Sequence, residues 1–270
     1  MPIWFNGKCS TDLGILVEHR PVRQIAQRRL DRIPVPGASR DIIQYQEDAW
    51  ENVPQPYDIA IVPALRRSKD LPLYARKVME WLHAPTDYVQ LSDSYDPNMF
   101  RMAAYTATGE KIENMLAKFG RATITFDCDG RWFYQDGDVW EEVDLTDGLS
   151  FLNPTPYASR PLISITGHGK FGWRLVNTTA GLDLTYMFNV TGNTNRTIRV
   201  EAEKAGDAYR ADNGANMNGV TTVTGSGPAG KVPIFPAAGT TVLTPVITET
   251  EGAADGVITQ MWIKKRWYTV

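Results

Sequence analysis

The sequence predicts a mainly β protein built from two domains. Short apolar segments of strand length alternate with turns rich in glycine, proline and asparagine along almost the whole chain. Helical periodicity is found in one stretch near residue 75, and none is found after residue 160. A length of 270 residues suits two ordinary domains. We therefore expect a β-rich domain with one α-helix over residues 1–135 and a β-sandwich over residues 136–270.

The apolar runs of the first half predict strands separated by turns. A Pro-Gly turn at Gly37 closes one of these strands, and the turn SYDPN joins two others into a hairpin. Alternating threonines in RATITFDCDG are typical of a further strand. The predicted strands are IWFN from Ile3, GILVEH from Gly14, RIPVPG from Arg32, DIAIV from Asp58, DYVQLSD from Asp87, MFRMAAYTA from Met99 and RATITFDCDG from Arg121.

The segment LPLYARKVMEWLHAP predicts the single helix of this half. Pro72 stands near its start and Pro85 just past its end, which are the positions that helices tolerate. Apolar residues recur along one face of this predicted helix, and such a face packs into the protein core far more often than it contacts a cofactor. Its apolar residues are Tyr74, Val78, Trp81 and Leu82.

The second half begins with an acidic, turn-rich passage and continues with strands alone. Residues 131–160 contain this passage, which we interpret in part as the connection between the domains. The strand-like segments that follow are short and punctuated by glycine and asparagine, the pattern of a two-sheet sandwich. They are PLISITGHG, WRLVNTT, LDLTYMFNV, RTIRVEAE, AYRA, GVTTVTG and VITQMWIKKRWYTV.

A G-x-G-x-x-G spacing at Gly225, Gly227 and Gly230 suggests a nucleotide site only at first sight. A phosphate-binding loop must open a helix, because the helix N-terminus supplies the dipole and the free N–H groups. Pro228 lies inside the motif, and further prolines follow as far as Pro245. We therefore expect a loop between strands and no nucleotide cofactor.

Titratable residues form no recognisable catalytic or metal-binding constellation. His19, His83 and His168 have neither metal-ligand spacing nor a neighbouring nucleophile. We expect Gly167–His168–Gly169 to be a flexible surface turn that exposes the histidine. Cys9 and Cys128 suit two reduced thiols. The carboxylates of residues 136–148 resemble a calcium loop but are interrupted by apolar residues, so a solvated connector is preferred. We expect no enzymatic activity, no metal and no cofactor.

Charge and hydropathy predict which classes of partner the chain avoids. The formal net charge is −3 and the pI about 5.7, which gives no whole-chain field for nucleic acid. The basic segment RPVRQIAQRRLDR predicts a long solvated hairpin or arm, with nucleic-acid binding as the weaker alternative. An apolar run long enough to cross a membrane is missing, and the first residues lack an export pattern. We expect a protein made in a cytosol and not inserted in a membrane.

Taken together, the segments resemble the distal tail proteins of long, flexible-tailed bacteriophages and related prophages. The resemblance spans nearly the whole chain and depends on the order and spacing of the pieces. The loops PGASRD and PAAGTT depart from the pattern of the family. In the first half the pieces are FNGKCSTDLGILVE, RRLDRIPVPGASRDI, YDIAIV, VMEWLHAP and VQLSDSYDPNMFRMA, and in the second half RPLISITGHG, RTIRVEAEKAGDAYRADNGANMN, VPIFPAAGTTVL and ITQMWIKKRWYTV.

This resemblance implies a structural protein of the virion, located at the tail tip and synthesised in the bacterial host cytoplasm. It implies a ring-forming first domain and a galectin-like or carbohydrate-module-like second domain. Six copies would form a ring that joins the tail tube to the baseplate and leaves a channel for DNA ejection. The implied partners are sister copies, the tail tube protein, a tail-associated hub or lysin protein, and receptor-binding or baseplate proteins.

Interface residues can be nominated from these patterns. The candidate ring contacts are Arg23, Arg28, Arg29 and Arg32 in the predicted arm and Tyr95 and Phe100 near the hairpin tip, and the candidate peripheral contacts are the sandwich loops around His168 and Trp173. Exposed β-edges would be satisfied by pairing between copies. Two alternatives stay open, a lectin-like domain that binds host-surface carbohydrate and a cell-wall hydrolase. Each tryptophan can stack on sugar, anchor an interface or fill the core.

Overall fold

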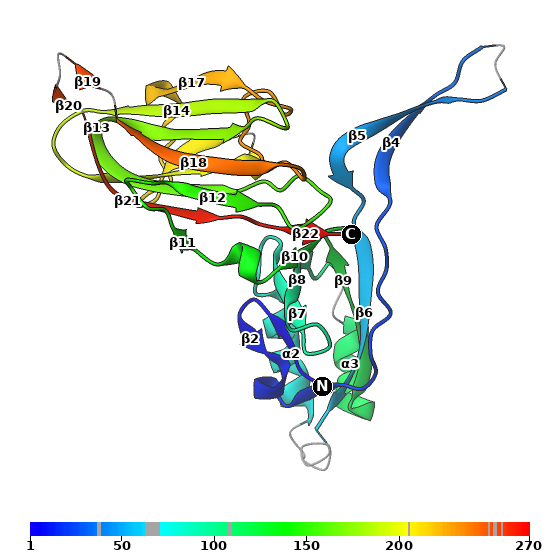
Figure 1. Cartoon of the computed structure of the whole chain (residues 1–270). Helices are drawn as coiled ribbons and strands as arrows, with labels where there is room; N and C mark the ends of the chain where they lie inside the picture. Colours follow the sequence, from blue (N-terminus) through cyan, green and yellow to red (C-terminus); the bar gives the residue numbers. More distant parts are fainter. Residues whose placement is uncertain are drawn as a thin grey trace. The chain divides into compact units, whose positions relative to one another are not determined.

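The computed structural model describes residues 1–36, 39–62, 71–106, 110–204, 206–247, 249–250, 253–254 and 256–270. The predicted mainly β class is confirmed, because strands account for 51% of the structure and form curled antiparallel sheets (Figure 1). The chain divides into two compact units. Unit 1 comprises Met1–Phe133 with Val270, and unit 2 comprises Tyr134–Thr269.

Unit 1 is an antiparallel sheet in the order β2-β1-β7-β8-β9-β6-β3. Its apolar residues alternate along each strand, so that one face of the sheet contributes to the core. The strands are β1 (Ile3–Phe5), β2 (Lys8–Cys9), β3 (Ile15–Val17), β6 (Val53–Ile61), β7 (Val89–Asp93), β8 (Met99–Ala104) and β9 (Arg121–Cys128), with the 3-10 turn η1 (Ser10–Leu13) after β2. The short strand β10 (Trp132–Tyr134) follows β9.

The N-terminal residue covers the outer edge of β3. The α-amino group of Met1 donates to the Val17 carbonyl oxygen at 2.9 Å, and the Val17 N–H donates to the Met1 carbonyl oxygen at 2.8 Å. At the other end of the sheet, β2 is only two residues long. The sheet of unit 1 therefore offers little unpaired backbone at its ends.

The predicted helix is confirmed as α2 (Leu71–His83). It packs on the sheet through Trp81, whose ring lies edge-on to Phe5 at 5.8 Å and whose Nε1–H donates to the Phe5 carbonyl oxygen at 3.1 Å. Within the part of the chain that is described, no helix is long and apolar enough to cross a membrane.

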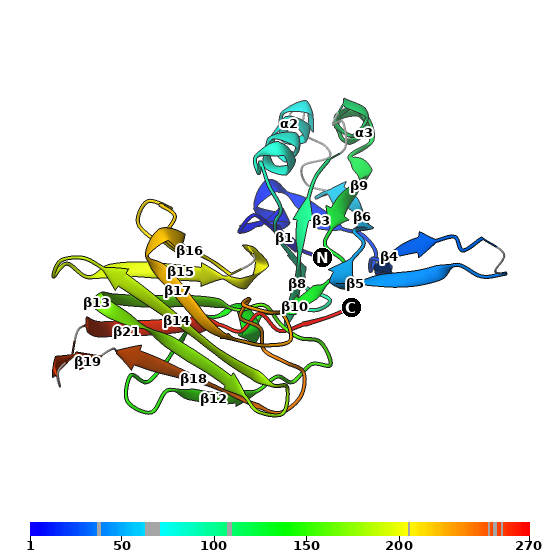
Figure 2. The same cartoon turned by 90° about the horizontal axis from the view of Figure 1, so that it is seen from above.

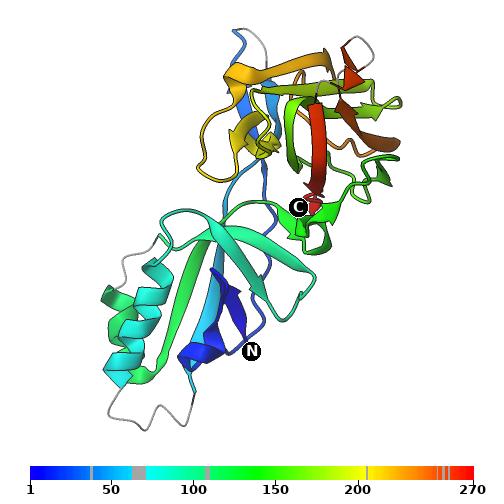
Figure 3. The ribbon, with the colours of Figure 1, turned by 90° about the vertical axis from the view of Figure 1, so that its left-hand side faces the viewer.

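A second helix, α3 (Glu110–Phe119), lies beside α2 and corrects the expectation of one helix (Figures 2 and 3). Its apolar residues do have helical spacing, at Ile112, Met115, Leu116 and Phe119. Only Leu116 among them is fully buried, and Phe119 is 71% exposed. The helical spacing of these four residues could therefore have predicted α3 from the sequence.

The predicted arginine-rich hairpin is a two-stranded sheet of its own, formed by β4 (Arg28–Ile33) and β5 (Ile42–Trp50) (Figure 1). We call residues 28–50 the arm. The strand expected from Arg32 to Gly37 begins earlier and ends at Ile33, and Gly37 itself lies outside the described residues. The returning strand β5 was not predicted, because its residues IIQYQEDAW do not alternate regularly between apolar and polar.

Unit 2 is a curled antiparallel sheet arrangement built around one long strand, β13 (Leu162–Asn177). Its other strands are β11 (Glu141–Glu142), β12 (Leu149–Leu152), β14 (Leu182–Val190), β15 (Arg196–Glu201), β16 (Asp207–Arg210), β17 (Thr221–Ser226), β18 (Thr240–Ile247), β21 (Gly256–Lys264) and β22 (Tyr268–Thr269), with the short pair β19 (Glu249–Thr250) and β20 (Ala253–Ala254). The 3-10 turns are η2 (Asp136–Asp138), η3 (Ala202–Lys204) and η4 (Asn218–Val220).

The long strand β13 exchanges both of its neighbours near its middle. Residues 162–167 pair with β15 and β21, whereas residues 171–176 pair with β14 and β18. The register with β21 shifts between Thr166 and Gly167, which marks a β-bulge. A strand that passes from one set of partners to another at a bulge joins the two layers of a sandwich.

The segment Gly167–His168–Gly169 was predicted to be a flexible turn, and this prediction was wrong. It lies inside β13, where the neighbours change. A Cβ on Gly167 would stand 2.2 Å from the Val257 carbonyl oxygen, so glycine permits the close approach of β21. The glycines that suggested a turn are therefore needed for close packing between strands.

The G-x-G-x-x-G stretch opens no helix. Gly227 and Gly230 exchange N–H···O bonds of 2.9 Å with each other, which forms a tight turn directly after β17. The expected loop from Gly225 to Pro245 was too long, however. Gly225 belongs to β17, and Pro245 belongs to β18, where it pairs with Trp173 of β13.

We expect Trp173→Ala to lower the free energy of unfolding by roughly 3–5 kcal/mol, the cost of emptying a large core site. Trp173 is fully buried and stacks on Tyr186 with ring centroids 4.4 Å apart. Urea denaturation followed by near-ultraviolet circular dichroism measures the loss. Val139→Ala is the control, because Val139 is 63% exposed and should change little. Equal effects of the two substitutions would contradict the assigned core.

Candidate functional site

Three of the arginines nominated as ring contacts lie together on β4. Arg28, Arg29 and Arg32 are all exposed. Arg28 pairs in register with Trp50 across the arm, and its guanidinium carbon lies 5.2 Å from the centre of the Trp50 ring. The base of the arm is thus held by a cation–π contact, and the arginines beyond it face solvent.

The arm also exposes large apolar side chains. Ile33 is 47% exposed and its cross-strand partner Ile42 is 55% exposed, while Ile43 is 49% and Val35 37% exposed. β-Branched residues suit a strand, yet here they cover no described core. An exposed apolar surface rimmed by charge is typical of an interaction site.

The backbone of the arm has open edges. Among the described strands, β4 pairs only with β5, and β5 only with β4. An isolated two-stranded ribbon is marginally stable in water, and its outer N–H and C=O groups can accept a further strand. The arm therefore combines unpaired edges with apolar and basic side chains.

The extended segment that leads into the arm, residues 20–27, is fastened to unit 1. We call it the strap. Gln55 Nε2 donates to the Val22 carbonyl oxygen at 3.2 Å, and Arg101 Nη2 donates to the Gln24 carbonyl oxygen at 2.9 Å. At the end of the strap the Glu51 N–H donates to the Gln27 carbonyl oxygen at 2.8 Å. The strap is thus held mainly by its backbone.

Two guanidinium groups approach the ring of Trp132 beneath the strap. The carbon of the Arg101 guanidinium lies 4.1 Å from the ring centre, and that of Arg23 lies 4.6 Å away. Arg23 also forms an ion pair with Asp96. Burial lowers the pKa of Arg101 to about 10, which leaves it charged at neutral pH. The ring and the carboxylate balance two neighbouring positive charges.

Asp93 shapes the hairpin turn that presents Asp96 to the strap. Its Oδ1 accepts the backbone N–H groups of Tyr95 and Asp96 at 2.9 and 3.2 Å. Its Oδ2 accepts the Tyr57 hydroxyl at 3.1 Å, and burial together with the Asp93 charge raises the Tyr57 pKa. A buried carboxylate therefore fixes the turn that contacts the strap.

Two nominated ring contacts of this hairpin have different environments. Tyr95 lies in the turn, with the guanidinium carbon of Arg20 5.7 Å from its ring centre. Phe100 was placed near the hairpin tip, and the structure corrects this placement. It lies in β8, is 4% exposed and stacks on Phe133 at 5.4 Å. The Phe100 ring is covered by this stacking and by its other neighbours, so it has too little exposed surface to meet another copy.

Close packing fixes the start of the arm against β9. A Cβ on Gly130 would lie 2.5 Å from the Ala26 Cβ and 2.6 Å from the Glu51 carbonyl oxygen. Ala26, in the strap, is 5% exposed. Only glycine therefore allows the strap, the end of the arm and the segment after β9 to meet here.

Sequence reasoning missed the residues that anchor the strap. Arg101 lies on the same face of β8 as Met99 and Ala103, and Gln55 on the same face of β6 as Val53 and Tyr57. Both side chains are 1% exposed. Both anchors could have been found in the sequence as polar residues at positions of a strand where alternation predicts an apolar, inward-facing residue.

The nominated peripheral residues in unit 2 do not form one surface. Trp173 is fully buried, which corrects its assignment to a contact loop. His168 is half-buried and its Nδ1 lies 2.7 Å from Asn195 Oδ1. It lines an open polar hollow of about 370 Å³, whose described lining contains no Trp, Tyr or Phe to stack on sugar. The lining is His168, Gly169, Lys170, Asn189, Val190, Thr191, Gly192, Asn193, Gly256 and Val257.

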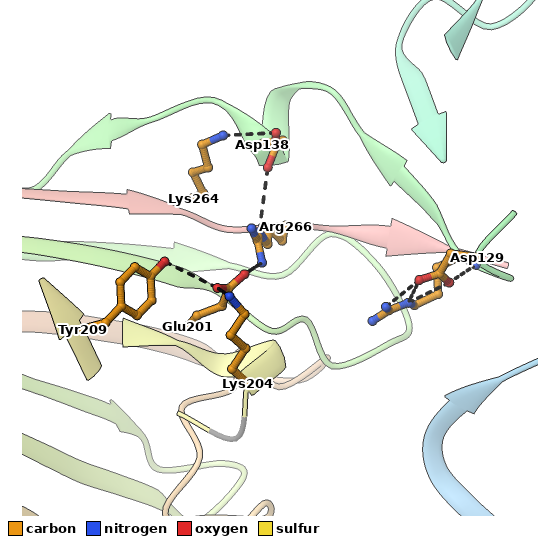
Figure 4. A network of polar contacts seen from close by, with 8 residues as sticks. Asp129, Asp138, Glu201, Lys204, Tyr209, Lys264 and Arg266 are labelled. Atoms are coloured by element: carbon orange, nitrogen blue, oxygen red, sulfur yellow. Dashed lines mark hydrogen bonds and ion pairs between the residues drawn. The ribbon is translucent and has the colours of Figure 1, made fainter. Parts of the chain in front are cut away.

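An ion-pair network ties the first residues of unit 2 to the end of β21 and to Arg266 just after it (Figure 4). Asp138 pairs with Lys264 at 3.1 Å and with Arg266 at 3.8 Å, and Arg266 pairs with Glu201 at 3.2 Å. Lys204 lies 3.1 Å from Glu201. Burial raises the Glu201 pKa, but Lys204 and Arg266 together lower it by more, so that the pKa lies below its ordinary value. The network is structural, since each carboxylate is neutralised by a cation.

Potential metal and thiol chemistry is limited in the described part of the chain. It holds no group of three or more His, Cys, Asp or Glu side chains placed to bind a metal ion. The expected acidic connector contains an exposed turn in which Asp144 Oδ1 accepts the N–H groups of Thr146 and Asp147 at 2.7 and 2.8 Å. Both cysteines are free, and Cys128 is buried.

No family model and no curated protein matches the chain. The crystal structure of the Dit protein of phage SPP1, described as a paradigm of the hub adsorption apparatus in Gram-positive infecting phages, matches with a TM-score of 0.57 and 14% identity over 97% of this chain and 98% of that chain.

The chain has the Dit fold. Two chains from structures of the phage P2 baseplate in its activated conformation are also similar. One, with calcium, has a TM-score of 0.51 and 10% identity over 95% of this chain and 92% of that chain. The other, with strontium, has the same TM-score and identity over 97% and 95%. The predicted resemblance to distal tail proteins is therefore confirmed for the fold.

We expect Gly130→Ala to destabilise the protein by about 1–3 kcal/mol, because the new methyl group overlaps backbone and Cβ atoms at the start of the arm. Urea denaturation monitored by tryptophan fluorescence measures this change. Gly219→Ala is the matched control, since a Cβ there meets nothing within 4 Å. A Gly130 variant as stable as the control would refute the close packing of the strap.

Proposed function

We propose that this protein is a structural component of a phage tail tip and that its arm joins copies of the chain into a closed hexameric ring. The observation that carries the proposal is a two-stranded arm with open edges and exposed isoleucines on a Dit fold. The solved proteins of similar fold are the phage SPP1 Dit protein and chains of the phage P2 baseplate.

Unpaired backbone supports assembly between copies. The sheet of unit 1 is covered at β3 by Met1, so its own edge offers little to a partner. The arm has two open edges, and strand addition would satisfy their N–H and C=O groups. In a cyclic ring each copy donates an arm and receives one, so that no arm edge is left unpaired.

Charge favours a second copy as the partner of the arm. Residues 20–40 contain six arginines and a single acidic residue, Asp31, which gives this segment a charge of +5. The whole chain has a formal charge of −3, so the remaining residues carry −8. A basic segment is attracted to the acidic remainder of its neighbours, and this attraction promotes encounter and fixes orientation.

The complete assembly implies further partners and a location in the virion. We propose that the ring lies between the tail tube protein and the baseplate or host-adhesion apparatus, with a central channel for DNA ejection. A tail-associated hub or lysin protein and receptor-binding proteins are the other expected neighbours. The work of such a protein is done by interfaces, without catalysis.

Reversing charge at Arg28 and Arg29 should shift the ring toward monomers. Both side chains are exposed on β4, so replacement by glutamate changes the docking surface and leaves the core intact. Light scattering coupled to size-exclusion chromatography gives the mass of the wild-type and variant particles. We expect a hexameric mass for the wild type and a mass several-fold smaller for the variant.

The matched control reverses Arg76 and Lys77, which are adjacent and exposed on α2. It changes net charge equally and should leave the mass unchanged. An Arg28/Arg29 variant that keeps the wild-type mass would argue against the arm as the ring contact.

A further inference from the structure

Two buried polar side chains in unit 1 have no role in its apolar core. Gln55 and Arg101 are each 1% exposed, at inward positions of β6 and β8. Arg101 Nε and Nη1 and Gln55 Oε1 have no hydrogen-bond partner within the described residues. An apolar residue of similar size at either position would avoid this cost, since buried unpaired polar atoms are unfavourable.

What these side chains do hold is the backbone of the strap. Gln55 binds the carbonyl oxygen of Val22, and Arg101 binds that of Gln24 two residues later. Among the described strands, residues 53–57 of β6 pair only with β9, because β3 pairs with residues 59–61. The strap is therefore joined to β6 at Gln55, where β6 has no second described strand, and side-chain donors instead of a backbone ladder hold its carbonyl oxygens.

The strap presents two large apolar side chains to solvent. Val22 is 77% exposed and Ile25 is 79% exposed, although Ala26 beside them is buried. Fixing these residues before binding reduces the entropy lost on association. The same anchoring determines where β4 begins, because the Gln27 carbonyl oxygen is bound by Glu51 at the base of the arm.

We propose that Arg101, with Gln55 and Trp132, is a positioning device that holds the strap so that Val22 and Ile25 extend the docking surface of the arm toward a second copy. This inference rests on the proposed assembly function. Arg101 is suited to the task because its guanidinium can donate to Gln24 and stack on Trp132 at the same time. Burying Arg101 destabilises the core, but it fixes the strap in a single orientation. Some buried polar groups in other proteins have this role.

The test replaces Arg101 by methionine and by lysine in the full chain. Methionine fills similar volume without a donor, whereas lysine keeps a charged donor for the Gln24 carbonyl oxygen. The control is Arg131→Met, because Arg131 also lies over an aromatic ring, that of Phe133 at 5.1 Å, and pairs with Asp129. Thermal unfolding and the initial rate of trypsin cleavage after Arg23 are measured for each dissociated protein.

We expect Arg101→Met to keep a wild-type unfolding midpoint and to be cleaved after Arg23 on the order of tenfold faster, the factor expected for losing one hydrogen bond from a charged donor. Lysine should restore part of the protection, and Arg131→Met should not alter it. Unchanged cleavage in Arg101→Met would overturn the inference, and so would a fall in midpoint that accounts for the faster cleavage. Particle mass is measured separately, so a wild type that forms no ring would reject the proposed function without affecting the result on the strap.

Discussion

Backbone hydrogen bonding at strand edges is the constraint on which the architecture of unit 1 depends. Every N–H and C=O removed from water needs a partner, and at the outer edge of β3 the backbone of Met1 supplies one for Val17. The arm is not satisfied in this way, because β4 and β5 have only each other among the described strands. The Val17 end of β3 is thus covered within the chain, whereas the ribbon of β4 and β5 has unpaired edges, which is a reason to expect a partner chain.

The strap shows how such a ribbon can be both exposed and oriented. Its carbonyl oxygens are bound by Gln55 and Arg101, while Val22 and Ile25 remain in solvent. Burying the polar side chains of Gln55 and Arg101 is unfavourable for the stability of the core, but it orders the strap. In unit 2 a different device has a related effect, since β13 exchanges its neighbours at a glycine-containing bulge and so belongs to both layers.

Periodicity in the sequence predicted the class of fold, helix α2 and most of the strands, because alternation and helical spacing reflect burial directly. It failed where tertiary contacts override local signals. The glycines around His168 suggested a turn but serve close strand packing, and Pro245 suggested a loop but lies in a strand. Trp173 and Phe100 were nominated for interfaces although they fill cores. The arm was predicted from its arginines, whereas the strap anchors depend on contacts between residues more than 30 positions apart.

Amide hydrogen exchange along β4 and β5 tests the central claim most directly. In dissociated protein, the amides that point away from the ribbon should exchange quickly, since no strand covers them. In the assembled particle the same amides should be strongly protected, because a strand or surface of a neighbouring copy accepts their hydrogen bonds. Equal and rapid exchange of these amides in both states would contradict the account, because the arm edges would then remain unpaired after assembly.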